Sequence, residues 1–208
     1  MIPIETILLF ILASAALGIS PGPDNIIVFS QAVANGRRAG ILVTFGLCTG
    51  LLVHTATVSL GIAAIFQTSP LAFTLLKIVG ALYLLYLAWQ AFNSNSTALE
   101  IGQEKALNWQ KLYVRGIIMN VTNPKVAIFF LAFLPQFTNP SVGSVPLQML
   151  LLGGLFILTT LVLFCGIAWF AGFLGQRLKK STKYRKYTNR VVGSVFTALA
   201  VKLIISSH

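Results

Sequence analysis

The sequence predicts an all-α integral membrane protein whose six transmembrane helices form two inverted three-helix repeats. Composition is the first of three observations behind this prediction. The mean hydropathy is +0.85 and only 9% of the 208 residues are charged, against about 25% in soluble domains. The second observation is the presence of six long apolar runs. The third is the gathering of basic residues in alternate connectors between those runs.

Each apolar run has about the 20 residues that a membrane-spanning helix needs. The six runs cover approximately 4–33, 40–66, 70–92, 113–137, 147–175 and 190–206. We expect one transmembrane domain over 1–208, divided into a first repeat over 1–92, a cytosolic connector over 93–112 and a second repeat over 113–208. Because each repeat holds an odd number of spans, the second repeat enters the membrane in the opposite orientation.

The basic residues predict the orientation of the helices. Twelve of the fifteen Lys and Arg residues lie in or beside the connectors after the first, third and fifth runs, and the other two connectors carry no charge. The twelve are Arg37, Arg38, Lys105, Lys111, Arg115, Arg177, Lys179, Lys180, Lys183, Arg185, Lys186 and Arg190. Because Lys and Arg are retained on the cytosolic side, we expect both termini outside. The net charge of +11 thus indicates the lipid bilayer, and not nucleic acid, as the partner.

Two polar motifs that contain proline interrupt the first and fourth apolar runs at corresponding places in the two halves. They are Ser20-Pro21-Gly22-Pro23-Asp24-Asn25 and Thr122-Asn123-Pro124-Lys125. Proline removes a backbone donor and disrupts the helical hydrogen-bond ladder, which hydrocarbon tolerates only where the freed groups face protein or a watery cavity. The motifs therefore predict that the first and fourth helices are broken and face each other near the membrane midplane.

Asp24 and Lys125 are the principal candidates for function. Asp24 is the only Asp in the chain, and Lys125 is one of three basic residues inside the runs, with Lys77 and Lys202. A charge near the bilayer centre costs about 3 kcal/mol on insertion scales, so such residues usually face a cavity or a partner. Lys125 lies ten residues beyond Arg115, which is about 15 Å along a helix and places it near the midplane.

The two motifs are expected to form one substrate site. Helix N-termini after Pro23 and Pro124 offer unpaired N–H groups that suit a carboxylate. Asp24 is expected to meet an amino group or to carry a coupling proton. The alternative is an ion pair between Asp24 and Lys125 that only fastens the halves together. The substrate-site candidates are Pro21, Gly22, Pro23, Asp24, Asn25, Asn123, Pro124 and Lys125.

Other residues in the runs have simpler alternatives. His54 and Lys77 are accessory candidates, although His54 also fits a satisfied polar core residue and Lys77 also fits a side chain that extends to the membrane surface. Cys48 and Cys165 lie in apolar runs, which favours packing over a disulfide. No metal, nucleotide or hydrolase motif stands in a suitable context. We therefore expect no enzyme activity, cofactor or metal.

Several strings along the chain resemble the LysE/RhtB family of amino-acid exporters. They are Pro21-Gly22-Pro23, Gly36-Arg37, Gly40, Lys77-Ile78-Val79-Gly80-Ala81-Leu82-Tyr83-Leu84, Asn123-Pro124-Lys125, Phe129-Phe130-Leu131 and Leu134-Pro135-Gln136-Phe137. The resemblance implies a multi-pass protein of the bacterial inner membrane that exports amino acids or close derivatives in exchange for protons. Neutral substrates such as threonine, homoserine or leucine are favoured over lysine, because the runs hold no cluster of acids. The sequence leaves open whether the protein forms a homodimer.

Two other functions remain as alternatives. One is a metal-ion exporter of related architecture, which the scarcity of acids and thiols disfavours. The other is a membrane thiol-disulfide electron carrier that uses Cys48 and Cys165, which fall in the second and fifth runs. Neither cysteine adjoins a proline motif or a group that would activate a thiolate.

The orientation gives a first testable prediction. A reporter fused after His208 is expected to be active on the outer face of the membrane, because twelve basic residues hold the intervening connectors in the cytosol. Paired alkaline phosphatase and fluorescent-protein fusions measure this directly. A reporter that is active only in the cytosol would contradict this orientation and mean that a helix has been miscounted.

Overall fold

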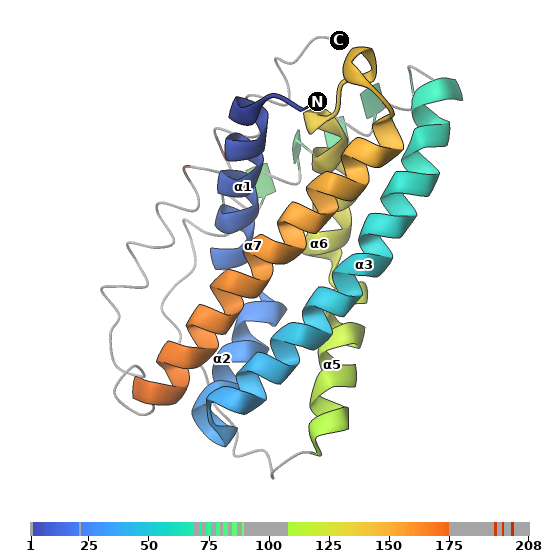
Figure 1. Ribbon diagram of the computed structural model, residues 1–208. Helices are drawn as coiled ribbons and strands as arrows, with labels where there is room; N and C mark the ends of the chain where they lie inside the picture. The colour runs from blue at the N-terminus through green and yellow to red at the C-terminus, as the bar shows by residue number, and fades with distance from the viewer. Residues whose placement is uncertain are drawn as a thin grey trace.

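The computed structural model describes residues 2–20, 22–68 and 108–174, with isolated residues between 71 and 89 and between 194 and 201 (Figure 1). Every regular element in these ranges is a helix. Two single helices are long and apolar enough to cross a membrane, and there are four candidate spans if each of two bent helix pairs counts as one. The expected spans at 70–92 and 190–206 lie largely outside the described residues.

The first apolar run forms two helices. α1 (Ile4–Ile19) and α2 (Pro23–Asn35) are inclined to each other by 62°. Pro23 occupies the first turn of α2, where the absent N–H would have had no intrahelical partner. The residues between the two helices, 20–22, are called the first junction below.

α2 ends at Gly36, whose φ of 84° is a conformation that glycine adopts without a steric penalty. The chain then turns directly into α3 (Arg37–Thr68). Arg37 and Arg38, expected in a connector, therefore form the first turn of a helix.

The second half begins with another bent pair. α5 (Trp109–Val121) and α6 (Pro124–Ile128) meet at residues 122–123, the second junction. α5 and the segment that α6 opens, Pro124–Phe137, are inclined by 48°. α5 begins within the C-terminal end of the expected connector over 93–112, where the Asn108 side chain accepts a hydrogen bond from the Gln110 N–H at 3.0 Å and caps the helix.

The chain beyond α6 does not continue as a regular α-helix. It widens into the π-helix η1 (Phe129–Phe133) and then tightens into the 3-10 helix η2 (Leu134–Phe137). Pro135 cannot donate a backbone hydrogen bond, so the α-helical ladder cannot pass through it. After the short 3-10 helix η3 (Pro140–Val142), α7 (Val145–Leu174) returns along the bundle.

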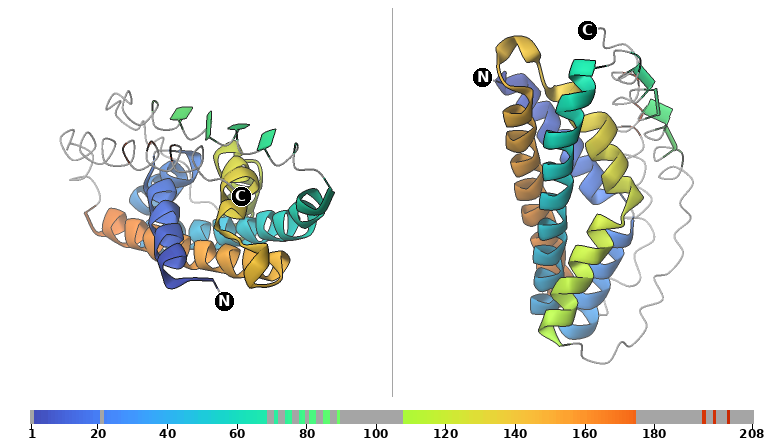
Figure 2. Two further views of the ribbon diagram at one scale, coloured as in Figure 1. Left: turned by 90° about the horizontal axis from the view of Figure 1, so that it is seen from above. Right: turned by 90° about the vertical axis from the view of Figure 1, so that its right-hand side faces the viewer.

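α3 and α7 run the length of the bundle, and α1 and α6 lie at one end while α2 and α5 lie at the other (Figures 1 and 2). Two apolar clusters fill these ends. One gathers around Phe10, Phe129, Phe130 and Phe156. The other packs α2, α5 and the adjoining parts of α3 and α7. The two junctions therefore lie between the clusters.

Close contact between α3 and α5 depends on glycine. A Cβ built at Gly46 would lie 3.0 Å from Cα of Gly116 and would collide with the Tyr113 carbonyl oxygen. A Cβ built at Gly116 would meet the Val43 carbonyl oxygen at 2.5 Å. Small residues in this position let two helix backbones approach directly.

Gly46→Ala is expected to lower stability by about 1–3 kcal/mol, because the new methyl group meets backbone atoms that cannot turn away. Gly154→Ala is the matched control, since a Cβ there has nothing within 4 Å. Thermal unfolding of the two purified variants in one detergent measures the difference. Equal unfolding temperatures would contradict the close α3–α5 contact.

Candidate functional site

Hydrogen bonds between distant parts of the chain join the two junctions. The Lys125 ammonium donates to the carbonyl oxygens of Leu17 at 3.1 Å and Ser20 at 3.0 Å. The Asn120 side-chain amide donates to Asp24 Oδ2 at 3.3 Å. The two polar motifs, about a hundred residues apart in sequence, therefore build one buried site.

The end of α1 explains the surroundings of Lys125. A helix that stops leaves its last carbonyl groups without N–H partners. The Lys125 ammonium donates a hydrogen bond to the Leu17 carbonyl oxygen, and the Asn25 side-chain amide donates one to the Gly18 carbonyl oxygen. Because these carbonyls form the negative end of the α1 dipole, they favour a cation. This environment allows Lys125 to be only 6% exposed.

The second junction satisfies its own groups differently. The Asn123 side-chain oxygen accepts from the Lys125 backbone N–H at 3.0 Å and caps α6. His54 Nε2 donates to the Asn120 carbonyl oxygen at 3.1 Å. By contrast, no side chain caps α2, whose N-cap is Gly22. Of the two helix N-termini expected to receive a carboxylate, only that of α2 is therefore without a cap.

Four buried side-chain atoms around the junctions have no hydrogen-bond partner among the described residues. They are Asp24 Oδ1, Asn25 Oδ1, Asn120 Oδ1 and Asn123 Nδ2, although the Asn123 side chain is near enough to the Asp24 carboxylate to interact with it. Buried polar atoms are nearly always paired in proteins, and each one that is not costs about 1–3 kcal/mol. A cluster of unpaired donors and acceptors beside two buried charges is the arrangement expected of a ligand site.

Asp24 and Lys125 line one cavity but form no direct ion pair with each other. The cavity measures about 20 Å³, which is room for about one water molecule. Its lining consists of Leu17, Gly18, Asp24, Leu51, Asn120, Lys125, Val126, Phe156, Thr160 and Phe164. Each charge follows the proline that opens its helix, so the two occupy equivalent positions in the halves.

Gly22 brings the Lys125 ammonium close to the start of α2. A Cβ built at Gly22 would lie 2.9 Å from Lys125 Nζ, so a larger residue there would displace the ammonium. The positive charge of Lys125 and the uncapped N-terminus of α2 thus lie side by side. Together they form the electropositive part of the site.

The other expected residues fall into three groups. His54 is half-buried, binds the Asn120 carbonyl and lies 5.7 Å from the Phe130 ring, so it supports the second junction. Pro23 and Pro124 are exposed and shape their helices without lining the cavity. Pro21, Lys77 and Lys202 lie outside the described residues.

Sequence reasoning missed Asn120 and Thr160. Asn120 is a lone amide within the apolar end of α5, two residues before the second motif, and this position was the available signal. Thr160 stands beside Thr159 on a helix that is apolar all round. No periodicity therefore distinguishes which of the two faces the cavity.

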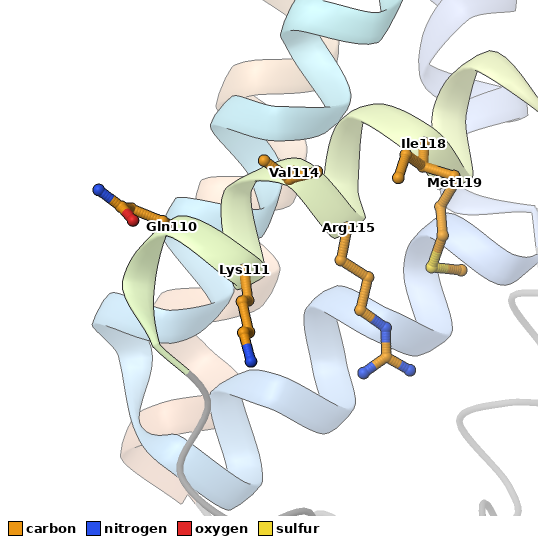
Figure 3. Close-up of a pocket in the computed structure, with 6 residues that line it drawn as sticks. All are labelled: Gln110, Lys111, Val114, Arg115, Ile118 and Met119. Atoms are coloured by element: carbon orange, nitrogen blue, oxygen red, sulfur yellow. The ribbon is translucent and has the colours of Figure 1, made fainter.

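A larger hollow of about 360 Å³ lies along one face of α5 (Figure 3). Its lining is Gln110, Lys111, Val114, Arg115, Ile118 and Met119. These residues include two cations and no acid, so the hollow lacks the opposed charges of the junction site.

The cysteines and acids of the described part of the chain form no metal centre. Cys48 on α3 and Cys165 on α7 are both free. The described residues contain no group of three His, Cys, Asp or Glu side chains placed to hold a metal ion.

Comparison with known proteins gives a consistent result. The profile of the LysE type translocator family matches residues 15–207. A homoserine/homoserine lactone efflux protein of Salmonella typhimurium is 31% identical over 96% of each chain. A leucine efflux protein of an Enterobacter species is 28% identical over 88% of this chain and 87% of its own. An uncharacterized membrane protein of Bacillus subtilis, YrhP, is 26% identical over 97% of this chain and all of its own.

No solved structure matches the chain significantly. The family match nevertheless covers almost the whole sequence, and the helices of the described part are apolar enough to cross a membrane. The chain therefore belongs to the LysE type translocator family and is a multi-pass protein of the bacterial inner membrane.

Proposed function

We propose that this protein exports neutral amino acids, or close derivatives, across the inner membrane. The observation that carries the proposal is the presence of Asp24 and Lys125 in one buried cavity without a direct ion pair. A free amino acid carries one ammonium and one carboxylate on adjacent carbons, so it complements two such side chains. The names of the homoserine and leucine efflux relatives support the same substrate class.

Each end of the substrate has a matching group. The substrate carboxylate binds Lys125 and the uncapped N-terminus of α2, where charge and helix dipole both favour an anion. The substrate ammonium binds Asp24 and the unpaired side-chain oxygen of Asn120. The contacts at Asp24 Oδ1 and Asn120 Oδ1 pair buried atoms that have no hydrogen-bond partner among the described residues.

Transport requires the bundle to open at each end in turn. The cavity is too small for an amino acid, and the two apolar clusters lie on either side of it. Separating the cluster around Phe129 and Phe130 opens one side, and separating the cluster around α2 and α5 opens the other. The π-helix η1 begins four residues after Lys125 and is a natural hinge.

Two inverted three-helix repeats, 1–92 and 113–208, are the architecture that we propose for this cycle. In it, α1 with α2 is one broken span and α5 with α6 is the equivalent broken span. The chain passes through the first pair towards the end of the bundle where α3 begins, and through the second pair in the opposite direction (Figure 1). Opposite directions are what inverted repeats require.

We also propose that Asp24 binds the coupling proton, and that this proton and the substrate occupy Asp24 in turn. Asp24 is 4% exposed, and it is the only Asp or Glu among the described residues that line the cavity. Its protonation removes the attraction for a substrate ammonium and so couples proton entry to substrate release. Antiport follows if Asp24 binds either the proton or the substrate but not both.

Asp24→Asn is therefore expected to abolish amino-acid accumulation driven by a pH gradient while it leaves exchange of internal for external substrate measurable. The amide keeps the size of the carboxylate but cannot take up a coupling proton. Proteoliposomes with an imposed pH gradient measure both activities. Glu5→Gln, an exposed carboxyl group on α1, is the control. Gradient-driven accumulation at the wild-type rate in Asp24→Asn would exclude the proton role.

Lys125→Met is expected to raise the substrate KM by about 10- to 100-fold, because a charge-assisted hydrogen bond to the substrate carboxylate is worth about 1.5–3 kcal/mol. Lys111→Met removes an exposed charge from α5 and is the control. Substrate exchange in proteoliposomes gives the KM of each variant, and thermal unfolding identifies any loss of folded protein. A folded Lys125→Met variant with an unchanged KM would contradict the carboxylate contact.

A further inference from the structure

One wall of the cavity belongs to α7 and carries no charge. Phe156, Thr160 and Phe164 contribute to it at intervals of four residues, so they lie on one face of the helix. All three are at most 5% exposed. The α7 side of the cavity is therefore a threonine between two phenylalanines.

The Thr160 hydroxyl differs from those of the other buried threonines in the described ranges. Thr44, Thr55 and Thr138 each donate to a backbone carbonyl, at 2.9, 2.8 and 2.7 Å. Thr160 is buried as well but makes no hydrogen bond within the described protein, although its helix offers the Phe156 carbonyl. A hydroxyl group on a cavity-lining residue that makes no hydrogen bond to its own helix is available to a ligand.

We infer that Thr160 selects substrates whose side chain carries a hydroxyl group. The inference rests on the proposed function, in which Asp24 and Lys125 hold the ammonium and the carboxylate. With those two charges engaged, the described residues that line the cavity offer no third charge for a charged side chain. Of the cavity's uncharged polar side chains, Asn120 is bonded to Asp24, and Thr160 belongs to α7. The matching substrates are short hydroxylated amino acids such as homoserine and threonine.

The aromatic neighbours strengthen this selection. Phe156 and Phe164 are each 3% exposed and restrict water around the Thr160 hydroxyl. A substrate with a methyl group in place of the hydroxyl would leave Thr160 without a partner. Discrimination is strong where a buried polar group loses its only bond in this way. We expect at least about a tenfold preference for the hydroxylated substrate.

The test compares two substrates of nearly the same shape. Norvaline has a methyl group where homoserine has a hydroxyl group, and valine replaces threonine in a protein in the same way. In proteoliposomes, wild-type protein is expected to prefer homoserine over norvaline by about tenfold in kcat/KM, and Thr160→Val is expected to reduce this ratio to about one. Thr160→Ser keeps the hydroxyl group and is expected to retain the preference.

Thr159→Val is the matched control. Its hydroxyl group is already bonded to the Leu155 carbonyl at 2.8 Å, and Thr159 does not line the cavity, so the variant is expected to keep the wild-type ratio. If Thr160→Val also keeps that ratio, or if the wild type treats the two substrates alike, this inference is wrong and the proposed export is unaffected. If the wild type transports no amino acid, the proposed function fails, and this inference fails with it.

Discussion

The bonds from the Lys125 ammonium to the end of α1 are the interaction on which the rest of the site depends. A lysine in hydrocarbon is costly, and so are the carbonyl groups that a helix leaves free when it stops inside a membrane. Lys125 lies on α6 and the carbonyls of Leu17 and Ser20 belong to the other half of the chain. The second half thus supplies the donor that the free carbonyls of α1 need, and the first half supplies the acceptors that the buried ammonium needs. These bonds fix the position of one half against the other.

The two junctions are alike in position but different in hydrogen bonding. Asn123 caps α6, whereas the start of α2 has only Gly22, which makes room for the Lys125 ammonium. Because of this difference, the start of α2, which carries Asp24 in its first turn, is uncapped and lies beside the Lys125 ammonium. A symmetric pair of caps would have satisfied both helices internally. The unpaired atoms would then not have been available to a substrate.

Closure of the site follows from the packing around it. One cluster contains Phe10, Phe129 and Phe156 in direct ring contact, with centroids 5.3–6.5 Å apart. The other fills the end of the bundle where α2 and α5 meet α3 and α7. A buried, water-poor cavity strengthens each electrostatic contact within it. The same packing that closes the site must therefore be opened to admit a substrate, which makes the clusters part of the transport mechanism.

The sequence by itself determined the membrane character, the family and the two candidate charges within the apolar runs. Hydropathy, charge placement and proline motifs are local features, so they can be recognised without knowing how the helices pack. The sequence identified Asp24, Lys125, Asn25 and Asn123 for that reason. Only the tertiary structure decided that Lys125 bonds to carbonyls of α1, that Asn120 holds Asp24, and that Thr160 and not Thr159 lines the cavity. These contacts depend on how α5, α6 and α7 are rotated about their axes. A helix that is apolar all round carries no periodic signal of that rotation.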